Sequence, residues 1–337
     1  MDLVAVQPYV ELADYLAEER FAAHLDRLAD RVEALRRSPE AVVVFPEDIG
    51  TFLALLAAPP EVRSASTLDH AFGLIGRRAW APLLATMARL RTRSLRRAFF
   101  HWAAPTVYGA WYRTFARIAR RLDAVVVAGS ALLPDNAFGY TSDRFQSRGG
   151  PVYNLSLTFG PDGRVRAVTK KRNLVPTQED VLDLAPGTAP LPDPVPVGSL
   201  RLGTAICYDA FVRPHTDREP GFTPLVPLLA ARGVDVVAQP AANPWPWEEP
   251  WVFAGPGDHR RRREQWEEES LPAAMRAEPR IRAGITAHLL ARLFDVRFEG
   301  PSAIYVRDGD HVRAVAVAPR ADAHPEAETV VAYTLPL

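Results

Sequence analysis

The stretch "AVVVFPE" (residues 41–47) is a continuous apolar run that ends in a proline and a carboxylate. Runs of this kind are typical of a strand that is buried on both faces. Similar runs return in "RLDAVVVAGS" (121–130), "LRLGTAICY" (200–208) and "VDVVAQP" (234–240). A strand covered on both sides needs a layer on each side, so the pattern indicates a layered fold.

Helical periodicity separates these runs. It predicts helices over 12–37, near 223–232 and within 264–278. A hairpin turn is expected at Pro161-Asp162-Gly163, inside residues 152–170. Further strands are expected at the following places: 3–7, 283–288, 301–306, 312–318 and 329–335. The mixture predicts an α/β protein in which both parallel and antiparallel strand pairs occur.

The composition excludes several classes of function. The chain of 337 residues has 40 Lys and Arg and 40 Asp and Glu, so no overall charge points to nucleic acid or membrane. Its one cysteine excludes an intramolecular disulfide and any multi-cysteine metal site. The start "MDLVAVQPYV" lacks the pattern of a signal peptide, and no stretch reaches the ~18 apolar residues of a membrane span. We therefore expect a cytoplasmic protein.

Three chemically useful side chains stand where apolar runs end. Glu47 ends "VVVFPE", Lys171 ends the "VRAVTKK" strand and Cys207 ends "LGTAIC". In α/β sheets, ligands bind outside the carboxyl ends of strands, where these groups could converge. Each residue also has an ordinary structural interpretation: a solvated loop glutamate, part of a surface charge run, and a packed cysteine.

Together these stretches resemble the nitrilase, or carbon–nitrogen hydrolase, superfamily, in the same order along the chain. "AVQP" is similar to the opening strand, "VVVFPE" to the glutamate motif and "VYNLSLTFGPDG" to the strand and turn before the lysine. "KKRNLVPTQE" resembles the lysine motif, and its spacing to Leu-Val-Pro selects Lys171 over Lys170. The motif's second glutamate falls on Glu179, and "ICYDAF" resembles the cysteine motif.

The resemblance implies a four-layer α-β-β-α sandwich and hydrolysis of an amide-type, non-peptide carbon–nitrogen bond. Cys207 would be the nucleophile and Glu47 the general base, because a free thiol with a pKa of about 8.5 is mostly protonated at neutral pH. Lys171 and the backbone N–H of Tyr208 would stabilise the oxyanion, while Glu179 would orient Lys171 or bind substrate. These roles need no metal and no organic cofactor. The resemblance also implies a homodimer or a larger homo-oligomer.

Two other functions remain open at this point. "LVP" followed by the second glutamate also resembles the nitrilase domain of apolipoprotein N-acyltransferases, in which an amine replaces water as the acyl acceptor. The third possibility is a nitrilase-like scaffold that binds a ligand without turnover.

The loops around the motifs supply candidates for substrate binding. After Cys207, "AFVRPHTDREPGFTP" (210–224) is longer and more charged than the corresponding turn of many relatives, and it contains His215. "QPAANPWPW" (239–247) resembles the substrate-side loop of the family, which singles out Asn243 and Trp245. Tyr153, next to the lysine motif's hairpin, is a further candidate. The expected partner is a small amide-type molecule.

The segment between Glu47 and "VVVAGS" departs most from the family. We expect a single domain over 1–337 with a basic, aromatic, helical insertion at about 51–121. Residues 77–121 carry 11 arginines, and no Asp or Glu occurs from His70 to Leu122. The segment could pack beside the site with its arginines paired to acids at 248–250 and 266–270. It could also form a lid that recognises an anion, or contact a membrane or a nucleic acid.

Overall fold

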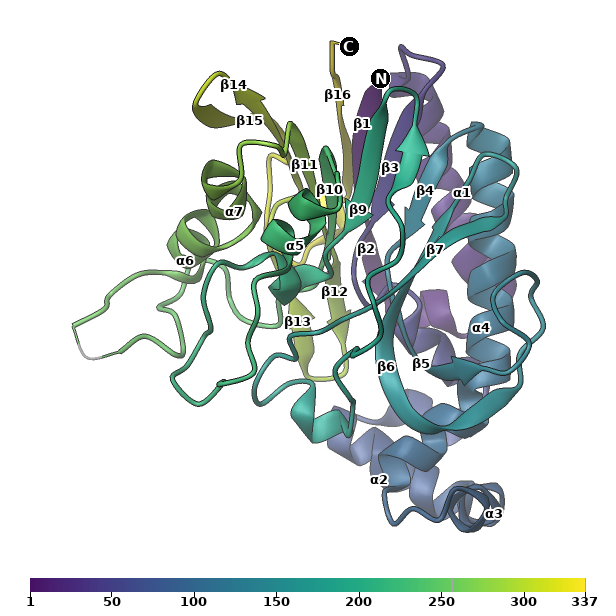
Figure 1. Ribbon diagram of the computed structural model, residues 1–337. Coiled ribbons are helices and arrows are strands. Elements are labelled where there is room, and N and C mark those ends of the chain that lie inside the picture. Colours follow the sequence, from purple (N-terminus) through teal and green to yellow (C-terminus); the bar gives the residue numbers. More distant parts are fainter. Residues whose placement is uncertain (256, 337) are drawn as a thin grey trace.

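The computed structural model describes residues 1–255 and 257–336. Two mixed β-sheets lie face to face in the middle of the molecule, and helices cover their outer faces (Figure 1). The chain ends lie together, because β1 pairs with β16 and the terminal amine donates to the Leu335 carbonyl over 3.1 Å.

The first sheet runs in the order β16-β1-β3-β4-β6-β5, and β7 pairs with β6. The neighbours β1, β3 and β4 are parallel, while β6 is antiparallel to β4, β5 and β7. The bounds are β1 Asp2–Gln7, β3 Ala41–Phe45, β4 Val125–Ala128, β5 Ala131–Asn136, β6 Ser147–Phe159, β7 Val165–Lys170 and β16 Thr329–Thr334.

The second sheet runs in the order β15-β14-β11-β10-β9-β8, with β9, β10 and β11 parallel. A third, small sheet has the order β13-β12-β2, and its strands β12 and β13 follow β11 in the sequence. The bounds are β8 Val195–Val197, β9 Leu200–Thr204, β10 Val236–Ala241, β11 Ala283–His288, β14 Ala303–Asp308, β15 His311–Val317, β2 Tyr9–Glu11, β12 Leu290–Leu293 and β13 Val296–Phe298.

The helices form the outer layers (Figure 1). Buried residues of α1 and α4 share one apolar cluster with the first sheet, and those of α5 and α7 share another with β10. The bounds are α1 Glu18–Leu35, α2 Leu68–Arg78, α3 Trp80–Leu90, α4 Leu95–Leu122, α5 Leu225–Ala231, α6 Arg262–Glu269 and α7 Leu271–Ala277. None of the described helices is both long and apolar enough to cross a bilayer.

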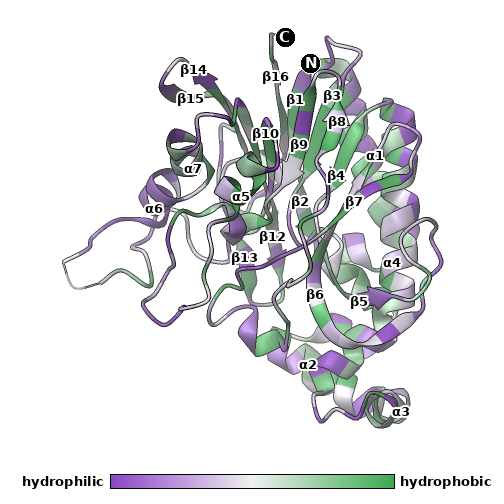
Figure 2. Cartoon of the chain, viewed as in Figure 1, coloured by the Kyte–Doolittle hydropathy of each residue, from purple (hydrophilic) through white to green (hydrophobic). Residues whose placement is uncertain are grey.

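Strand β1 explains why the apolar runs are continuous. Leu3 and Ala5 belong to the cluster between the two sheets, whereas Val4 and Val6 belong to the cluster under the helices. Successive side chains of a strand point to opposite faces, so a strand between two apolar layers must be apolar throughout. Figure 2 shows this as green strands in the centre of the molecule. The predicted four-layer α-β-β-α sandwich is confirmed.

Two predicted helices differ in their bounds. Residues 12–15 form a separate 3-10 turn, so the helix expected over 12–37 begins only at Glu18. The helix expected within 264–278 is divided into α6 and α7, with extended backbone at Ser270 between them. Pro272 fits the first turn of a helix but not its interior, so a new helix begins at Leu271.

The segment 51–121 folds into 3-10 helices η2 (Thr51–Leu56) and η3 (Pro60–Ser64), followed by α2, α3 and α4. In the part of the chain that the structure describes, its arginines form no ion pairs with the acids at 248–250 and 266–270, which one interpretation expected. Helix α4 lies beside α1 instead, and three of its arginines pair there: Arg113 with Glu18 at 2.7 Å, Arg117 with Asp26 at 2.5 Å and Arg121 with Glu33 at 2.8 Å.

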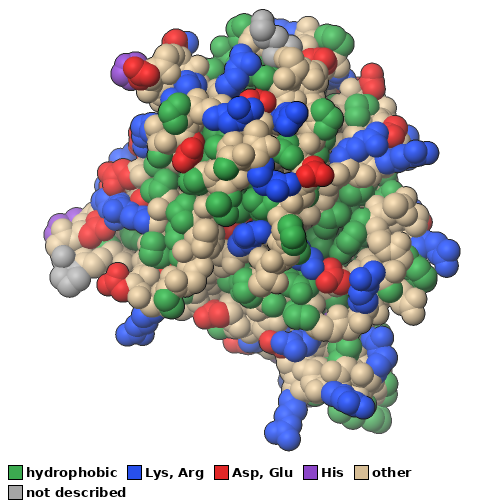
Figure 3. Space-filling view, viewed as in Figure 1, with side chains coloured by type: hydrophobic (Ala, Val, Ile, Leu, Met, Phe, Trp, Pro, Cys, Tyr) green, Lys and Arg blue, Asp and Glu red, His purple; other side chains and the backbone are tan. Residues whose placement is uncertain are grey.

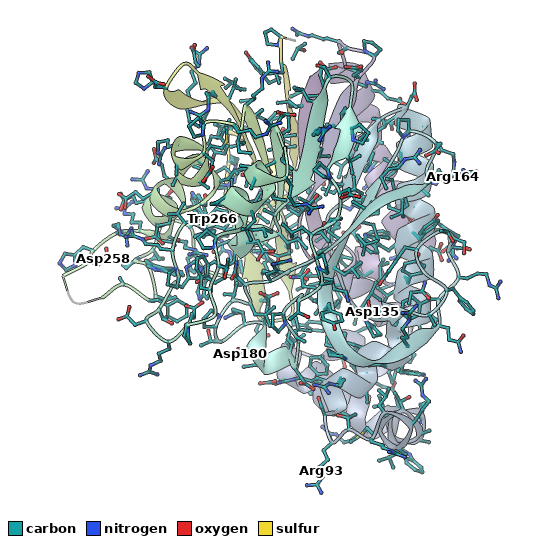
Figure 4. The ribbon with its side chains drawn as sticks, viewed as in Figure 1. Arg93, Asp135, Arg164, Asp180, Asp258 and Trp266 are labelled. Carbon is teal, nitrogen blue, oxygen red and sulfur yellow. The ribbon has the colours of Figure 1, made fainter. Side chains whose placement is uncertain are left out.

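The acids at 248–250 and 266–270 lie on the other side of the sandwich, where Arg260, Arg261 and Arg263 pair with several of them. Figure 4 shows Arg93 at the far tip of the turn between α3 and α4, pointing away from the body of the molecule. Figure 3 shows positive and negative side chains interspersed over the visible face. The arginine-rich segment therefore largely serves as an outer helical layer.

Candidate active site

Three strand ends bring the predicted catalytic residues to one cavity. Glu47 follows β3, Lys171 directly follows β7, and Cys207 begins the short 3-10 helix η5 (Cys207–Ala210) after β9. All three line a cavity of about 390 Å³. The two facing sheets thus present a carboxylate, an amine and a thiol to the same space.

Lys171 lies between two carboxylates. Its Nζ is 2.7 Å from Glu47 Oε1 and 2.6 Å from Glu179 Oε2, and the side chain is only 1% exposed. Asn154 joins the same two acids, since its Nδ2 donates to Glu47 Oε1 over 2.8 Å and to Glu179 Oε1 over 2.9 Å. The Val175 N–H adds a hydrogen bond of 2.8 Å to Glu179 Oε2. These contacts fix the ammonium in the cavity wall.

Burial and charge act in opposite directions on this group. Burial alone would lower the pKa of Lys171, but the carboxylates of Glu179 and Glu47 outweigh it and raise the pKa well above its usual value. Burial also raises the pKa of Glu47, although the charge of Lys171 partly opposes the rise. The result is a permanent cation beside a carboxylate with increased affinity for a proton.

Cys207 has an unusual backbone. Its φ is +47°, in the left-handed region that non-glycine residues seldom adopt. The Cys207 carbonyl accepts a hydrogen bond from Gln239 Nε2 at 2.9 Å, and Gln239 Oε1 accepts one from Thr286 Oγ1 at 2.7 Å. Two buried side chains of the second sheet therefore hold the strained residue in place.

Ala242, directly after β10, aligns the thiol and the carboxylate. Its N–H donates to Glu47 Oε2 over 3.1 Å, and its carbonyl oxygen lies 3.8 Å from Cys207 Sγ. Burial and the charge of Glu47 raise the pKa of Cys207 well above its usual value, although Lys171 acts in the other direction. The thiol is thus protonated at rest, with an acceptor for its proton next to it.

Asp209 connects the cysteine turn to the lysine segment. Its buried carboxylate accepts from the Arg172 N–H at 3.1 Å, the Asn173 N–H at 2.8 Å and Asn173 Nδ2 at 3.1 Å. Burial raises its pKa to about 7 despite these bonds. The two segments that carry Lys171 and Cys207 therefore hold a fixed relative position.

One end of the cavity is apolar. We call it the apolar arm and define it by Phe72 and Ile75 of α2 and Phe99 and Phe100 of α4, all of which line the cavity. The Phe72 ring packs edge-on against Phe99 at 5.7 Å and Phe100 at 6.3 Å between centroids. The aromatic residues of the segment 51–121 thus form part of the wall of the candidate active site.

The predicted substrate-binding residues divide into two groups. His215 and Trp245 line the cavity, and the His215 ring stacks on Tyr208 with 3.9 Å between centroids. Asn243 and Tyr153 are not among the described lining residues. The Asn243 amide donates to the Trp245 carbonyl and accepts from Arg262, and the Tyr153 ring lies 3.7 Å from Lys170 Nζ, outside the site.

Sequence reasoning missed two side chains of the site. Asn154 follows Tyr153 on β6, so the alternation of the strand turns the asparagine toward Glu47 and the tyrosine away. Arg262 lines the cavity from the start of α6, within the run "RRRR" (260–263). Its only sequence signal is helical spacing to Gln265, Trp266 and Glu269, all buried.

Solved structures of other proteins share this architecture. An amidase from Nesterenkonia sp. AN1, described as belonging to the nitrilase superfamily, aligns with a TM-score of 0.57 at 16% identity, covering 100% of this chain and 92% of that one. The chain has the nitrilase-superfamily fold. Another structure of that amidase, with acrylamide added at its active-site cysteine, gives a TM-score of 0.56 at 16% identity over 100% and 93% of the two chains.

A more distant nitrilase-fold protein shares the architecture. Saccharomyces cerevisiae Nit3, described as a member of branch 10 of the superfamily, aligns with a TM-score of 0.53 at 16% identity, over 99% of this chain and 89% of that one. No protein-family model matches the sequence, and a search of curated proteins finds no match. The likeness to these proteins therefore lies in the fold.

Proposed function

We propose that this protein is a carbon–nitrogen hydrolase that cleaves a non-peptide, amide-type bond through an acyl-enzyme at Cys207. The observation that carries the proposal is the Glu47–Lys171 contact of 2.7 Å in a cavity that Cys207 also lines. A base, a cation and a nucleophile are the groups that acyl transfer to a thiol requires. The acrylamide adduct at the active-site cysteine of the Nesterenkonia amidase supports the choice of nucleophile.

In the first half-reaction, Glu47 takes the thiol proton as Cys207 Sγ bonds to the amide carbonyl carbon. The carbonyl oxygen becomes an oxyanion that the Lys171 ammonium stabilises. The Tyr208 N–H is available for the same task, because the second residue of a helix has no intrahelical acceptor. The carbon–nitrogen bond then breaks, and protonated Glu47 gives its proton to the leaving amine.

In the second half-reaction, water replaces the amine. Glu47, again ionised, takes a proton from water while the hydroxide oxygen bonds to the thioester carbon. The carbon–sulfur bond breaks, the acid leaves, and the proton on Glu47 returns to the sulfur. Asn154 and Glu179 keep Glu47 and Lys171 in position throughout. Asn154 donates to both Glu47 and Glu179, and Glu179 in turn accepts from Lys171.

Ammonia release from a panel of simple amides tests the proposal. The wild-type protein should release ammonia without an added acceptor, and Cys207→Ala should release none while its thermal midpoint stays within a few degrees. A transient mass increase equal to the acyl group should locate on Cys207. Turnover that persists in folded Cys207→Ala would contradict the nucleophile assignment.

A second candidate function is acyl transfer to an amine. The apolar arm favours it, since a long acyl chain seated against Phe72 and Phe99 would shield the thioester from water. Hydroxylamine added to the assay separates the two: a transferase forms hydroxamate and releases almost no free acid in its absence. A hydrolase releases free acid at its full rate in the absence of hydroxylamine, because water attacks its thioester.

A further inference from the structure

Arg262 is a buried cation that pairs with no carboxylate among the residues the structure describes. The residue is 2% exposed, begins α6 and lines the catalytic cavity. Within residues 1–255 and 257–336, no ion pair includes it. Its chain neighbours behave differently: Arg260 pairs with Asp258 at 2.7 Å, and Arg261 and Arg263 each pair with Glu248 at 3.2 and 3.3 Å.

Neutral groups hold this guanidinium in position. Nε donates to Asn243 Oδ1 over 2.8 Å, and Nη1 donates to Gln265 Oε1 over 2.5 Å. The Trp251 ring lies 3.9 Å and the Trp245 ring 4.9 Å from the guanidinium carbon. Among the described residues no acceptor bonds to Nη2. The edge of the guanidinium that carries Nη2 is therefore available to a ligand, and the bonds at Nε and Nη1 fix its orientation.

A buried charge that lacks a counter-ion destabilises a fold, because the group loses its hydration. A bound ligand of opposite charge would offset that loss. Burial lowers the pKa of Arg262 to about 9, so the group stays charged at neutral pH. A carboxylate that enters the cavity would supply the missing counter-ion. The planar guanidinium matches a carboxylate geometrically, and the low polarity of the tryptophan surroundings strengthens the pair.

The cavity also shows where the rest of such a substrate would lie. Arg262 packs with Trp266 of the α6 side, whereas the apolar arm belongs to α2 and α4. Figure 4 shows Trp266 near α6, and Figure 1 shows α2 at the bottom of the view, away from α6. Cys207, from the second sheet, lines the same cavity. A ligand with a charged end and an apolar end fits these two walls.

We propose that Arg262 binds a carboxylate of the substrate, so that the amide cleaved at Cys207 carries an anionic group on one side and an apolar group on the other. This inference rests on the proposed hydrolase function. The carboxylate can belong either to the acyl part or to the amine that leaves. Both arrangements share the same recognition chemistry, and the choice of substrates distinguishes them.

Two matched pairs of amides test the proposal. Adipamic acid against hexanamide places the carboxylate on the acyl part, and N-hexanoylglycine against N-isobutylhexanamide places it on the leaving amine. One carboxylate member should exceed its neutral partner in kcat/KM by tenfold or more, by about the strength of a charge-assisted bidentate bond. A wild-type preference for the neutral member of both pairs would overturn the proposal.

Variants assign the preference to Arg262. Arg262→Gln should reduce the ratio of carboxylate to neutral kcat/KM by about 10- to 100-fold, and Arg262→Lys by less, because lysine keeps the charge and loses the fork. Arg263→Gln is the matched control, since Arg263 is an exposed neighbour, and it should leave the ratio unchanged. Equal losses on both members of the pair in Arg262→Gln would assign a purely structural role.

A binding measurement separates this inference from the proposed reaction. Calorimetric titration of Cys207→Ala with the preferred carboxylate amide should give binding that the Cys207→Ala/Arg262→Gln double variant loses. Retained binding together with no turnover of any amide by the wild type would overturn the hydrolase function and leave the anion site standing. Equal affinity in the single and double variants would overturn the anion site alone.

Discussion

At the scale of the residue, the site is organised by one ammonium shared between two carboxylates. Lys171 neutralises only one negative charge, so Glu47 and Glu179 together leave the resting cluster with an excess negative charge. In the proposed mechanism, transfer of the thiol proton to Glu47 moves that excess charge onto the sulfur without changing the total charge. In that mechanism, forming the thiolate adds no net charge to the buried cluster.

Glu47→Gln tests this proton transfer. The amide keeps the shape of the carboxylate, and its oxygen can accept from Lys171 Nζ and Asn154 Nδ2, but the side chain cannot take the thiol proton. We expect kcat for ammonia release to fall by about 10²–10⁴-fold, the usual contribution of a general base. A fall of less than tenfold, in protein whose circular dichroism matches the wild type, would contradict the role of Glu47.

The sequence singled out Glu47, Lys171 and Cys207 as candidates because each stands at a strand end, and the resemblance to the family's lysine motif added Glu179. The structure brings all four to one cavity. Asn154 was missed because its register against Glu47 depends on which face of β6 turns inward, and Tyr153 was chosen in its place. Arg262 was missed because four consecutive arginines look alike until the fold buries one of them.

At the scale of the element, α2 and the start of α4 line the cavity with residues that have the pattern of a protein core. Phe72, Ile75 and Phe99 have the helical spacing of ordinary core residues, so the sequence gives no sign that a cavity opens beside them. Strand positions were predictable because a strand that is buried on both faces is a continuous apolar run. The apolar arm depends on how two helices pack against each other, and local sequence does not encode that packing.

Ile75→Phe tests the apolar arm. The larger ring should fill part of the cavity, so the kcat/KM ratio of hexanamide to acetamide should fall by tenfold or more. Leu74→Phe, one position away on α2 and outside the described cavity lining, is the matched control and should leave the ratio unchanged. An unchanged ratio in Ile75→Phe would show that acyl chains lie elsewhere.

At the scale of the whole molecule, a charge cluster joins the N-terminal part of the chain to the segment that leads into the last strand. His24 of α1 is 2.6 Å from Glu328 Oε2 and 3.2 Å from Asp14 Oδ1, and the Tyr9 N–H donates to Glu328 over 3.2 Å. This cluster links the first helix to the segment before β16. The sandwich is thereby closed by a charge cluster as well as by the pairing of β1 with β16.

The charge cluster predicts a pH dependence of stability. Burial opposes the charge of His24, but Asp14 and Glu328 outweigh it and raise its pKa from 6.5 to about 9. The stabilisation is therefore complete below pH 6.5 and is lost as the pH rises through about 9. His24→Gln should lower the melting temperature more at the acidic end of this window than above it. His311→Gln, at an exposed position, is the control, and a loss equal at both ends would contradict the linkage.

The left-handed backbone of Cys207 has a consequence for how this position tolerates change. A residue with a Cβ at φ +47° costs about 1–2 kcal/mol that glycine would avoid. Selection for folding alone would therefore favour glycine here and discard the sulfur. At this position the backbone angle that is best for stability calls for glycine, whereas the proposed reaction calls for a thiol. The hydrogen bonds through Gln239 and Thr286 hold the strained cysteine in place.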